Sequence, residues 1–141
     1  MSKEKIVYIT RRERFSAAHK LYREEWSLDK NYEGFGKCSN VNWHGHNYEM
    51  FVTLKGSVDE KTGFVADLGD VSKILKVEVI DKLDHKNLNL DVDFMKSVTT
   101  STENLAIKCW EAIEEKINNL GCKLHCIKIT ETENNSVEYY G

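Results

Sequence analysis

Two histidines separated by one residue, His44 and His46, are the residues of this chain best placed for chemistry. In a β-strand, residues i and i+2 point to the same face, so the two imidazoles would share one face. His19, which ends an earlier predicted strand, is the best candidate for a third ligand. Three histidine ligands leave one tetrahedral position open, which is typical of catalytic zinc acting as a Lewis acid. The alternative is that these are ordinary histidines of a half-exposed strand.

Cys38 is the candidate general base or nucleophile. It follows a loop that contains Gly34 and Gly36, and Lys37 precedes it directly. A cysteine in such polar, basic surroundings is suited to proton transfer or covalent catalysis. The alternative, a buried small apolar residue, suits Cys109 better, because Cys109 lies on the apolar stripe of a predicted helix.

Acidic residues supply the remaining candidates. Asp84 precedes His85 and could orient it and stabilise its charged form, although a solvated turn is the alternative. Glu131 ends a predicted strand, and a carboxylate can accept two parallel N–H bonds from a 2-amino-4-oxo heterocycle. Glu103 could do the same, or it could form a helix capping box with Thr100.

Alternating and helical apolar patterns define the elements that position these residues. We predict a long irregular segment over residues 22–43, because it is polar and contains two glycines. The order of elements is β-β-α-α-β-β, which predicts an α+β fold with an antiparallel four-stranded sheet. The strands are predicted at residues 6–19, 44–55, 124–130 and 137–140, and the helices at residues 68–79 and 101–118.

Length and composition describe one soluble domain over residues 1–141. The chain has 20 Lys and Arg against 23 Asp and Glu, a formal net charge of −3, which disfavours nucleic acid as a partner. It has no apolar stretch of about 20 residues, so we expect no membrane span. No signal peptide precedes the first strand, so a cytoplasmic location with reduced cysteines is expected. Open strand edges predict assembly into an oligomer.

Seven sequence segments occur in the order found in one enzyme family: FSAAHKLY, FGKCSN, NWHGHNYE, TGFVADL, LDHKNLN, TSTENLA and TETENN. Through these segments, the chain resembles the 6-pyruvoyl-tetrahydropterin synthase family over nearly its whole length. The resemblance implies the tunnelling fold (T-fold), in which trimers form a closed barrel and two trimers stack as a homohexamer.

This resemblance also implies an activity and a set of site residues. The activity is a zinc-dependent lyase reaction of tetrahydrobiopterin biosynthesis. It converts 7,8-dihydroneopterin triphosphate to 6-pyruvoyl-tetrahydropterin with loss of triphosphate. The residues that match the family are His19, His44 and His46 for zinc, Cys38 with Asp84 and His85 for proton transfer, and Glu131, Glu103 and Thr102 for the pterin.

Two alternatives remain open at this point. The 6-carboxy-tetrahydropterin synthases of the queuosine pathway share the fold and the zinc, but typically have C-x3-HGH, whereas this chain has C-x5-HGH. A catalytically silent pterin- or zinc-binding scaffold is the second alternative, and the complete set of candidate residues disfavours it. The chain departs from the family at Val41 and Trp43, where relatives commonly have proline and glycine.

Overall fold

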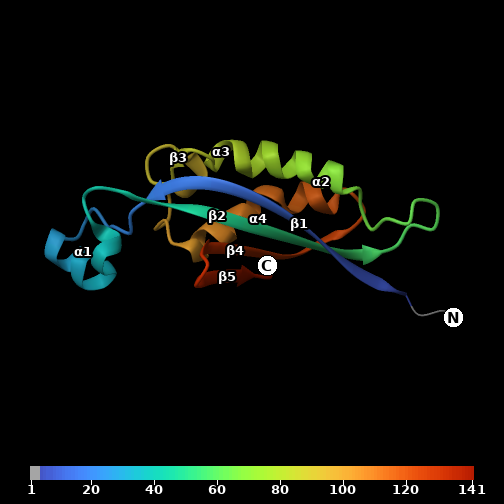
Figure 1. The fold of residues 1–141 in the computed structure, drawn as a ribbon, viewed down its shortest axis with the longest axis horizontal. Coiled ribbons are helices and arrows are strands. Elements are labelled where there is room, and N and C mark those ends of the chain that lie inside the picture. The colour runs from blue at the N-terminus through green and yellow to red at the C-terminus, as the bar shows by residue number, and fades with distance from the viewer. Residues whose placement is uncertain (1–3) are drawn as a thin grey trace.

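Two long antiparallel strands form the central part of the sheet. The computed structural model describes residues 4–141, in which β1 (Ile6–His19) pairs with β2 (His44–Ser57) along its whole length (Figure 1). Both strands are rich in β-branched and aromatic residues that alternate between buried and exposed positions. The pairing register sets His19 directly opposite His44. The expected strands are therefore confirmed, with β2 ending two residues later than predicted.

The complete sheet has the order β3-β1-β2-β4-β5. Strands β4 (Lys123–Thr132) and β5 (Asn135–Tyr139) continue the antiparallel sheet beyond β2. Strand β3 (Lys86–Asn87) pairs parallel to the end of β1 and was not predicted. Two residues are too short to show the period-2 pattern by which strands are recognised, so this edge strand leaves no signal in the sequence.

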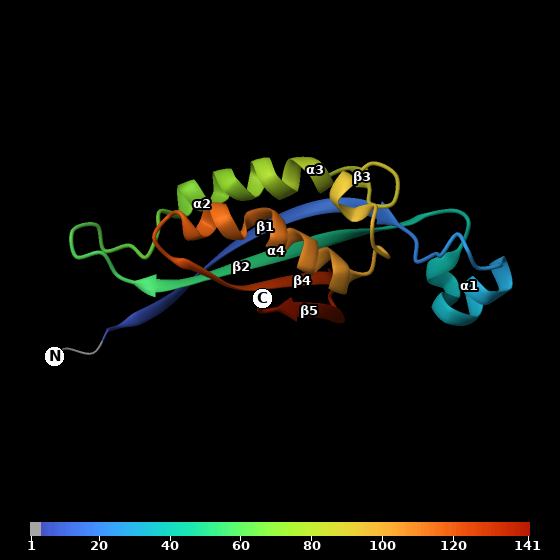
Figure 2. The same cartoon turned by 180° about the vertical axis from the view of Figure 1, so that it is seen from behind.

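Helices cover one face of this sheet and leave the other face open (Figures 1 and 2). Helix α2 (Leu68–Leu75) begins at the predicted cap, Asp67, whose carboxylate accepts a hydrogen bond from the backbone N–H of Gly69 at 2.7 Å. One π-helical turn (Lys76–Ile80) joins it to α3 (Asp81–Leu83). The predicted α+β class is confirmed.

The second long helix, α4 (Thr102–Asn118), lies beside the first on the same face. Its predicted capping box with Thr100 is wrong. Ser101 is the N-cap, and its hydroxyl accepts a hydrogen bond from Asn104 N at 3.2 Å. The Thr100 hydroxyl instead donates to the carbonyl of Lys20 at 3.1 Å, because Thr100 is buried where the chain passes the end of β1.

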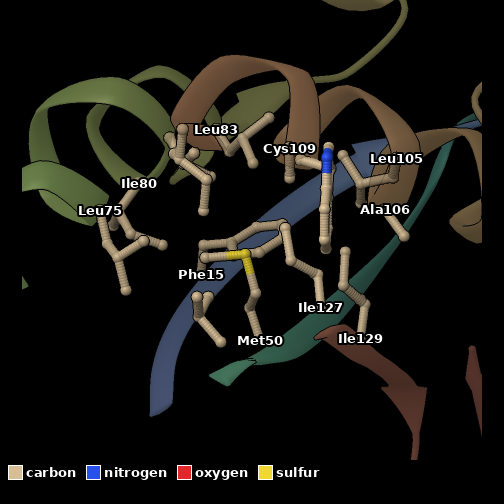
Figure 3. Close-up of a cluster of buried hydrophobic side chains, with 14 of the residues drawn as sticks. Phe15, Met50, Leu75, Ile80, Leu83, Leu105, Ala106, Cys109, Ile127 and Ile129 are labelled. Carbon is tan, nitrogen blue, oxygen red and sulfur yellow. The ribbon is translucent and has the colours of Figure 1, made fainter. Parts of the chain in front are cut away.

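The core lies between the helices and the covered face of the sheet (Figure 3). Alternate residues of each strand point into it, and both helices contribute one apolar stripe. Cys109 is fully buried there, as expected, and burial raises the pKa of its thiol to about 12. No helix in residues 4–141 has the length and apolar character needed to cross a membrane.

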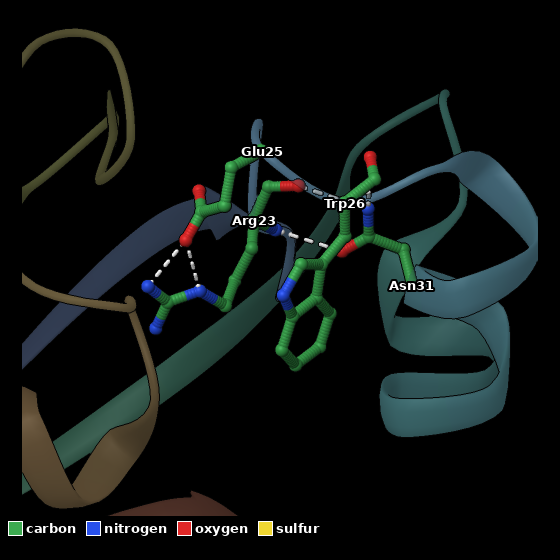
Figure 4. Close-up of polar contacts among 4 residues, drawn as sticks. All are labelled: Arg23, Glu25, Trp26 and Asn31. Atoms are coloured by element: carbon green, nitrogen blue, oxygen red, sulfur yellow. Dashed lines mark hydrogen bonds and ion pairs between the residues drawn. The ribbon is translucent and has the colours of Figure 1, made fainter.

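The segment predicted as irregular contains helix α1 (Leu28–Phe35) and a 3-10 turn (Gly36–Ser39), so that prediction is wrong in part. This excursion projects beyond the end of the sheet (Figure 1). Its centre is polar: the amide of Asn31, 1% exposed, is its innermost side chain (Figure 4). The helix has no apolar stripe facing a core, which is the pattern that identifies most helices in a sequence.

Candidate metal centre and adjoining cavities

The end of β1 and the start of β2 bring three histidines together. One ring nitrogen from each of His19, His44 and His46 lies within 4.8 Å of the other two. The ring centroids are 4.6 Å apart for His19 and His44, and 5.1 Å for the two pairs that include His46. His46 pairs across the sheet with Ala17, whose methyl group leaves room for the three rings. The predicted triad is therefore assembled by strand register.

The protonation of the triad suits a cation. The His19 Nδ1 lies 2.7 Å from the carbonyl oxygen of Thr100, an arrangement that directs a proton to Nδ1 and leaves the Nε2 lone pair free. Burial lowers the pKa values of His19 and His44, which keeps both rings neutral near pH 7. The buried Nε2 of His46 has no hydrogen-bond partner. Three imidazoles whose ring nitrogens converge in this way fit a zinc ion.

A buried tyrosine lies under the triad. The hydroxyl of Tyr48 is 3.5 Å from His19 Nε2, and its ring stacks on Phe15 with centroids 4.9 Å apart. Burial raises the pKa of this phenol, so that it remains neutral. Tyr48 was not predicted as a site residue, although it continues the same strand face as His44 and His46.

Glu131 joins the triad to a neighbouring cavity. One oxygen of its carboxylate lies 3.6 Å from His46 Nε2, and the other accepts a hydrogen bond from the Thr102 hydroxyl at 2.5 Å. Glu131, Thr102 and Glu103 line one cavity of about 270 Å³ between the start of α4 and the hairpin of β4 and β5. The structure therefore brings together the three residues that were predicted to bind one ligand.

Asp84 and His85 form a pair at the end of α3. The Asp84 carboxylate lies 3.1 Å from His85 Nδ1 and accepts a hydrogen bond from Ser16 N at 2.9 Å, which lowers the pKa of Asp84. His85 has a positive φ of 60° and its side chain is 83% exposed. Both His85 and His46 line a second cavity of about 520 Å³ beside the strands. His85 and the ligand candidate His46 thus share one cavity.

Cys38 lies apart from that pair. It is exposed in the 3-10 turn after α1, and its carbonyl accepts a hydrogen bond from Leu21 N at 2.8 Å, which ties the turn to the end of β1. Within residues 4–141, no hydrogen bond joins its thiol to Asp84 or His85. A single chain thus assembles the triad, the carboxylate cavity and the Asp–His pair, and leaves Cys38 on a separate surface.

Trp43, one of the two departures from the family pattern, packs on a lysine. Its ring centroid lies 4.4 Å from the Nζ of Lys20, the residue that follows His19. The side chain is 37% exposed. Lys20 was also absent from the predicted site, although both residues adjoin predicted metal ligands in the sequence.

An α+β fold with a three-histidine cluster that could hold a metal ion, and with an adjoining carboxylate cavity, is the arrangement of a protein suited to a small polar ligand. Comparisons with known proteins identify the family. Residues 8–141 match the family described as 6-pyruvoyl tetrahydropterin synthase, and the chain belongs to this family.

Three relatives illustrate the similarity. The chain is 44% identical to a 6-pyruvoyl tetrahydrobiopterin synthase of Dictyostelium discoideum, with 97% of this chain and 98% of that protein covered. It is 42% identical to the human protein of that name, covering 94% of this chain and 90% of the relative. The solved structure of the Caenorhabditis elegans 6-pyruvoyl tetrahydropterin synthase superimposes with a TM-score of 0.92 at 41% identity, covering 100% of this chain and 99% of that one.

Proposed function

We propose that this chain is a zinc-dependent 6-pyruvoyl-tetrahydropterin synthase, which converts 7,8-dihydroneopterin triphosphate to 6-pyruvoyl-tetrahydropterin and releases triphosphate. The observation that carries the proposal is the contact between Glu131 and His46, which joins a carboxylate-lined cavity to a three-histidine centre. A bound pterin ring in that cavity would place its three-carbon side chain at the centre. The family membership and the relatives' names support the same activity.

Glu131 is the proposed anchor of the pterin ring. Its carboxylate can accept parallel hydrogen bonds from the 2-amino group and the adjacent ring N–H, which gives both affinity and orientation. The Thr102 hydroxyl, already donating to this carboxylate, fixes its rotamer before the ligand binds. Glu103 lies on the rim of the same cavity and is proposed to contact the ring from a second side.

His19, His44 and His46 would hold the zinc ion, which polarises the side-chain oxygens of the substrate and acidifies the neighbouring C–H bonds. Cys38 is proposed to remove and return protons at these carbons as the general base. Asp84 holds His85 through the 3.1 Å contact, and this pair is proposed to relay the protons. The rearrangement is an internal redox reaction followed by elimination, so it requires no nicotinamide.

We further propose a cytoplasmic homohexamer. The sheet face opposite the helices is open, and the start of β1 exposes Ile6, Val7 and Tyr8 by 46%, 40% and 54%. Closing these strands against other subunits would bury this surface and pair the free strand edges. In such an assembly, Cys38 of one subunit would reach the Asp–His pair of a neighbour. Four free cysteines agree with a reducing compartment.

The test is incubation of the purified, zinc-loaded protein with 7,8-dihydroneopterin triphosphate and identification of the product by mass spectrometry. We expect the 6-pyruvoyl product. A 6-carboxy product would favour the queuosine-pathway enzyme, and unchanged substrate would favour the silent scaffold.

Cys38→Ala tests the proposed base. It should retain zinc and the oligomer but lose about 100-fold or more of the turnover, the usual contribution of a positioned general base. Cys126→Ala, which removes a thiol from β4, is the matched control and should retain activity. Wild-type turnover by the Cys38 variant would exclude the proposed role.

A further inference from the structure

A third cavity, of about 470 Å³, is lined by Lys20 and Thr100, which adjoin the metal centre through His19. The Lys20 Nζ lies 4.4 Å from the ring centroid of Trp43 and 4.8 Å from that of Tyr22. No carboxylate of residues 4–141 forms an ion pair with it. Aromatic rings hold a cation in place without neutralising it, so the ammonium group keeps its full charge for another partner.

The backbone of Lys20 is fixed by the same frame that orients the metal ligand beside it. The Asn89 side chain accepts a hydrogen bond from Lys20 N at 3.1 Å and donates one to Lys20 O at 3.0 Å. The Thr100 hydroxyl donates to Lys20 O, while the Thr100 carbonyl faces His19 Nδ1. Lys20 is thus held rigidly next to the centre, as a ligand-binding group must be.

The rest of the cavity leaves Lys20 as its unpaired cation. Ser97 and Thr99 line it and offer two hydroxyl donors, whereas the Lys96 ammonium group lies 3.0 Å from the Asp93 carboxylate. Of the two carboxylates in the lining, Glu25 is paired with Arg23 (Figure 4), and Glu24 remains. Lys20 is therefore the one lysine or arginine of this lining that has no ion pair within residues 4–141.

The linear shape of the proposed substrate connects this cavity to the active site. The molecule consists of a pterin ring, a three-carbon chain and a triphosphate. With the ring at Glu131 and the carbons at the triad, the phosphates must leave on the side away from Glu131. Lys20 follows His19 and Trp43 precedes His44, and both line this cavity and not the cavity of Glu131.

We propose that Lys20, clamped by Trp43 and Tyr22, binds the triphosphate group of the substrate. A lysine ammonium is a strong point-charge ligand for phosphate oxygens. This inference rests on the proposed function, because it takes the substrate from there. It assigns the triphosphate a site that no feature of the sequence indicated.

The test compares two ligands by fluorescence titration of the zinc-loaded protein: oxidised neopterin triphosphate and oxidised neopterin, which lacks the phosphates. The ratio of their dissociation constants isolates the contribution of the triphosphate and needs no turnover. We expect Lys20→Gln to weaken binding of neopterin triphosphate about tenfold. Its affinity for neopterin should stay unchanged, and Lys20→Arg should restore most of the ratio.

Two lysines serve as comparisons. Lys61→Gln removes an exposed charge from the turn after β2 and should leave the ratio unchanged. Lys86 lines the other large cavity, beside His85, so a loss in Lys86→Gln but not in Lys20→Gln would overturn the proposal. An unchanged ratio in Lys20→Gln would also overturn it. Failure of the proposed function would look different: a 6-carboxy product, or neopterin that binds to no variant.

Discussion

Asn31→Ala should increase local unfolding of the segment that carries Cys38, while the sheet stays folded. The two N–H groups of the Asn31 amide donate to the carbonyls of Arg23 at 3.0 Å, Ser27 at 3.0 Å and Trp26 at 3.3 Å, one of them shared between two carbonyls, and its oxygen accepts from Arg23 N at 2.7 Å. Figure 4 shows the contacts with Arg23 and Trp26. These bonds cross the whole turn that leads into α1. Few other side chains of residues 22–43 are buried, so the excursion has little apolar packing to replace them.

The magnitude follows from these bonds. The amide has two N–H groups and one oxygen in use, which amounts to three full hydrogen bonds. A typical intramolecular hydrogen bond contributes about 0.5–1.5 kcal/mol net, so removing three should cost the segment about 1.5–4.5 kcal/mol. Local opening of α1 would then be at least about tenfold more populated, since about 1.4 kcal/mol corresponds to a factor of ten. Asn31→Asp should be as severe, because it places a carboxylate oxygen against the three carbonyls.

Native-state hydrogen exchange is the suitable assay. Amides of α1 should lose protection at least about tenfold, while amides of β2 and β4 keep theirs. Bound zinc should be unchanged and turnover reduced, because Cys38 is no longer held. Asn42→Ala, an exposed asparagine in the same segment, is the control. Unchanged exchange of α1 in Asn31→Ala would refute the view that this buried amide organises the excursion.

Three further predictions concern the metal centre and its cavity. His46→Ala should lose stoichiometric zinc in elemental analysis, because it removes one of three converging nitrogens, and full metal content would contradict the three-histidine centre. Glu131→Gln should weaken neopterin binding by about 1.5–3 kcal/mol, roughly ten- to hundredfold, with the fold retained; equal affinity would exclude Glu131 as the anchor. Burial lowers the pKa of His19 below its ordinary 6.5, so the unfolded chain takes up this proton at a higher pH than the folded one. The metal-free protein should therefore lose stability as the pH falls through about 6.5 until it reaches the folded pKa, and urea midpoints of His19→Gln should show a weaker dependence there.

The fold was predictable where a strand or helix is long enough to show its hydrophobic pattern over several periods. Fourteen-residue strands such as β1 and β2 show their alternation over many residues, and α2 has both a cap at Asp67 and an apolar stripe. Strand β3 and helix α1 escaped prediction for the opposite reason. The first is two residues long. The second has eight residues within a polar segment, and it packs around the buried Asn31 while its apolar residues Leu28 and Tyr32 remain exposed.

The sequence alone was sufficient to select the residues that we propose for the chemistry. The spacing of His44 and His46 places both rings on one strand face whatever the rest of the fold does, because side chains alternate with a period of two. Which groups surround these two rings depends on the tertiary structure. Pairing register sets His19 opposite His44, and the β4–β5 hairpin brings Glu131 within 3.6 Å of His46. Contacts between residues 81 positions apart, such as His19 with Thr100, depend on the packing of whole elements, and no local pattern encodes them.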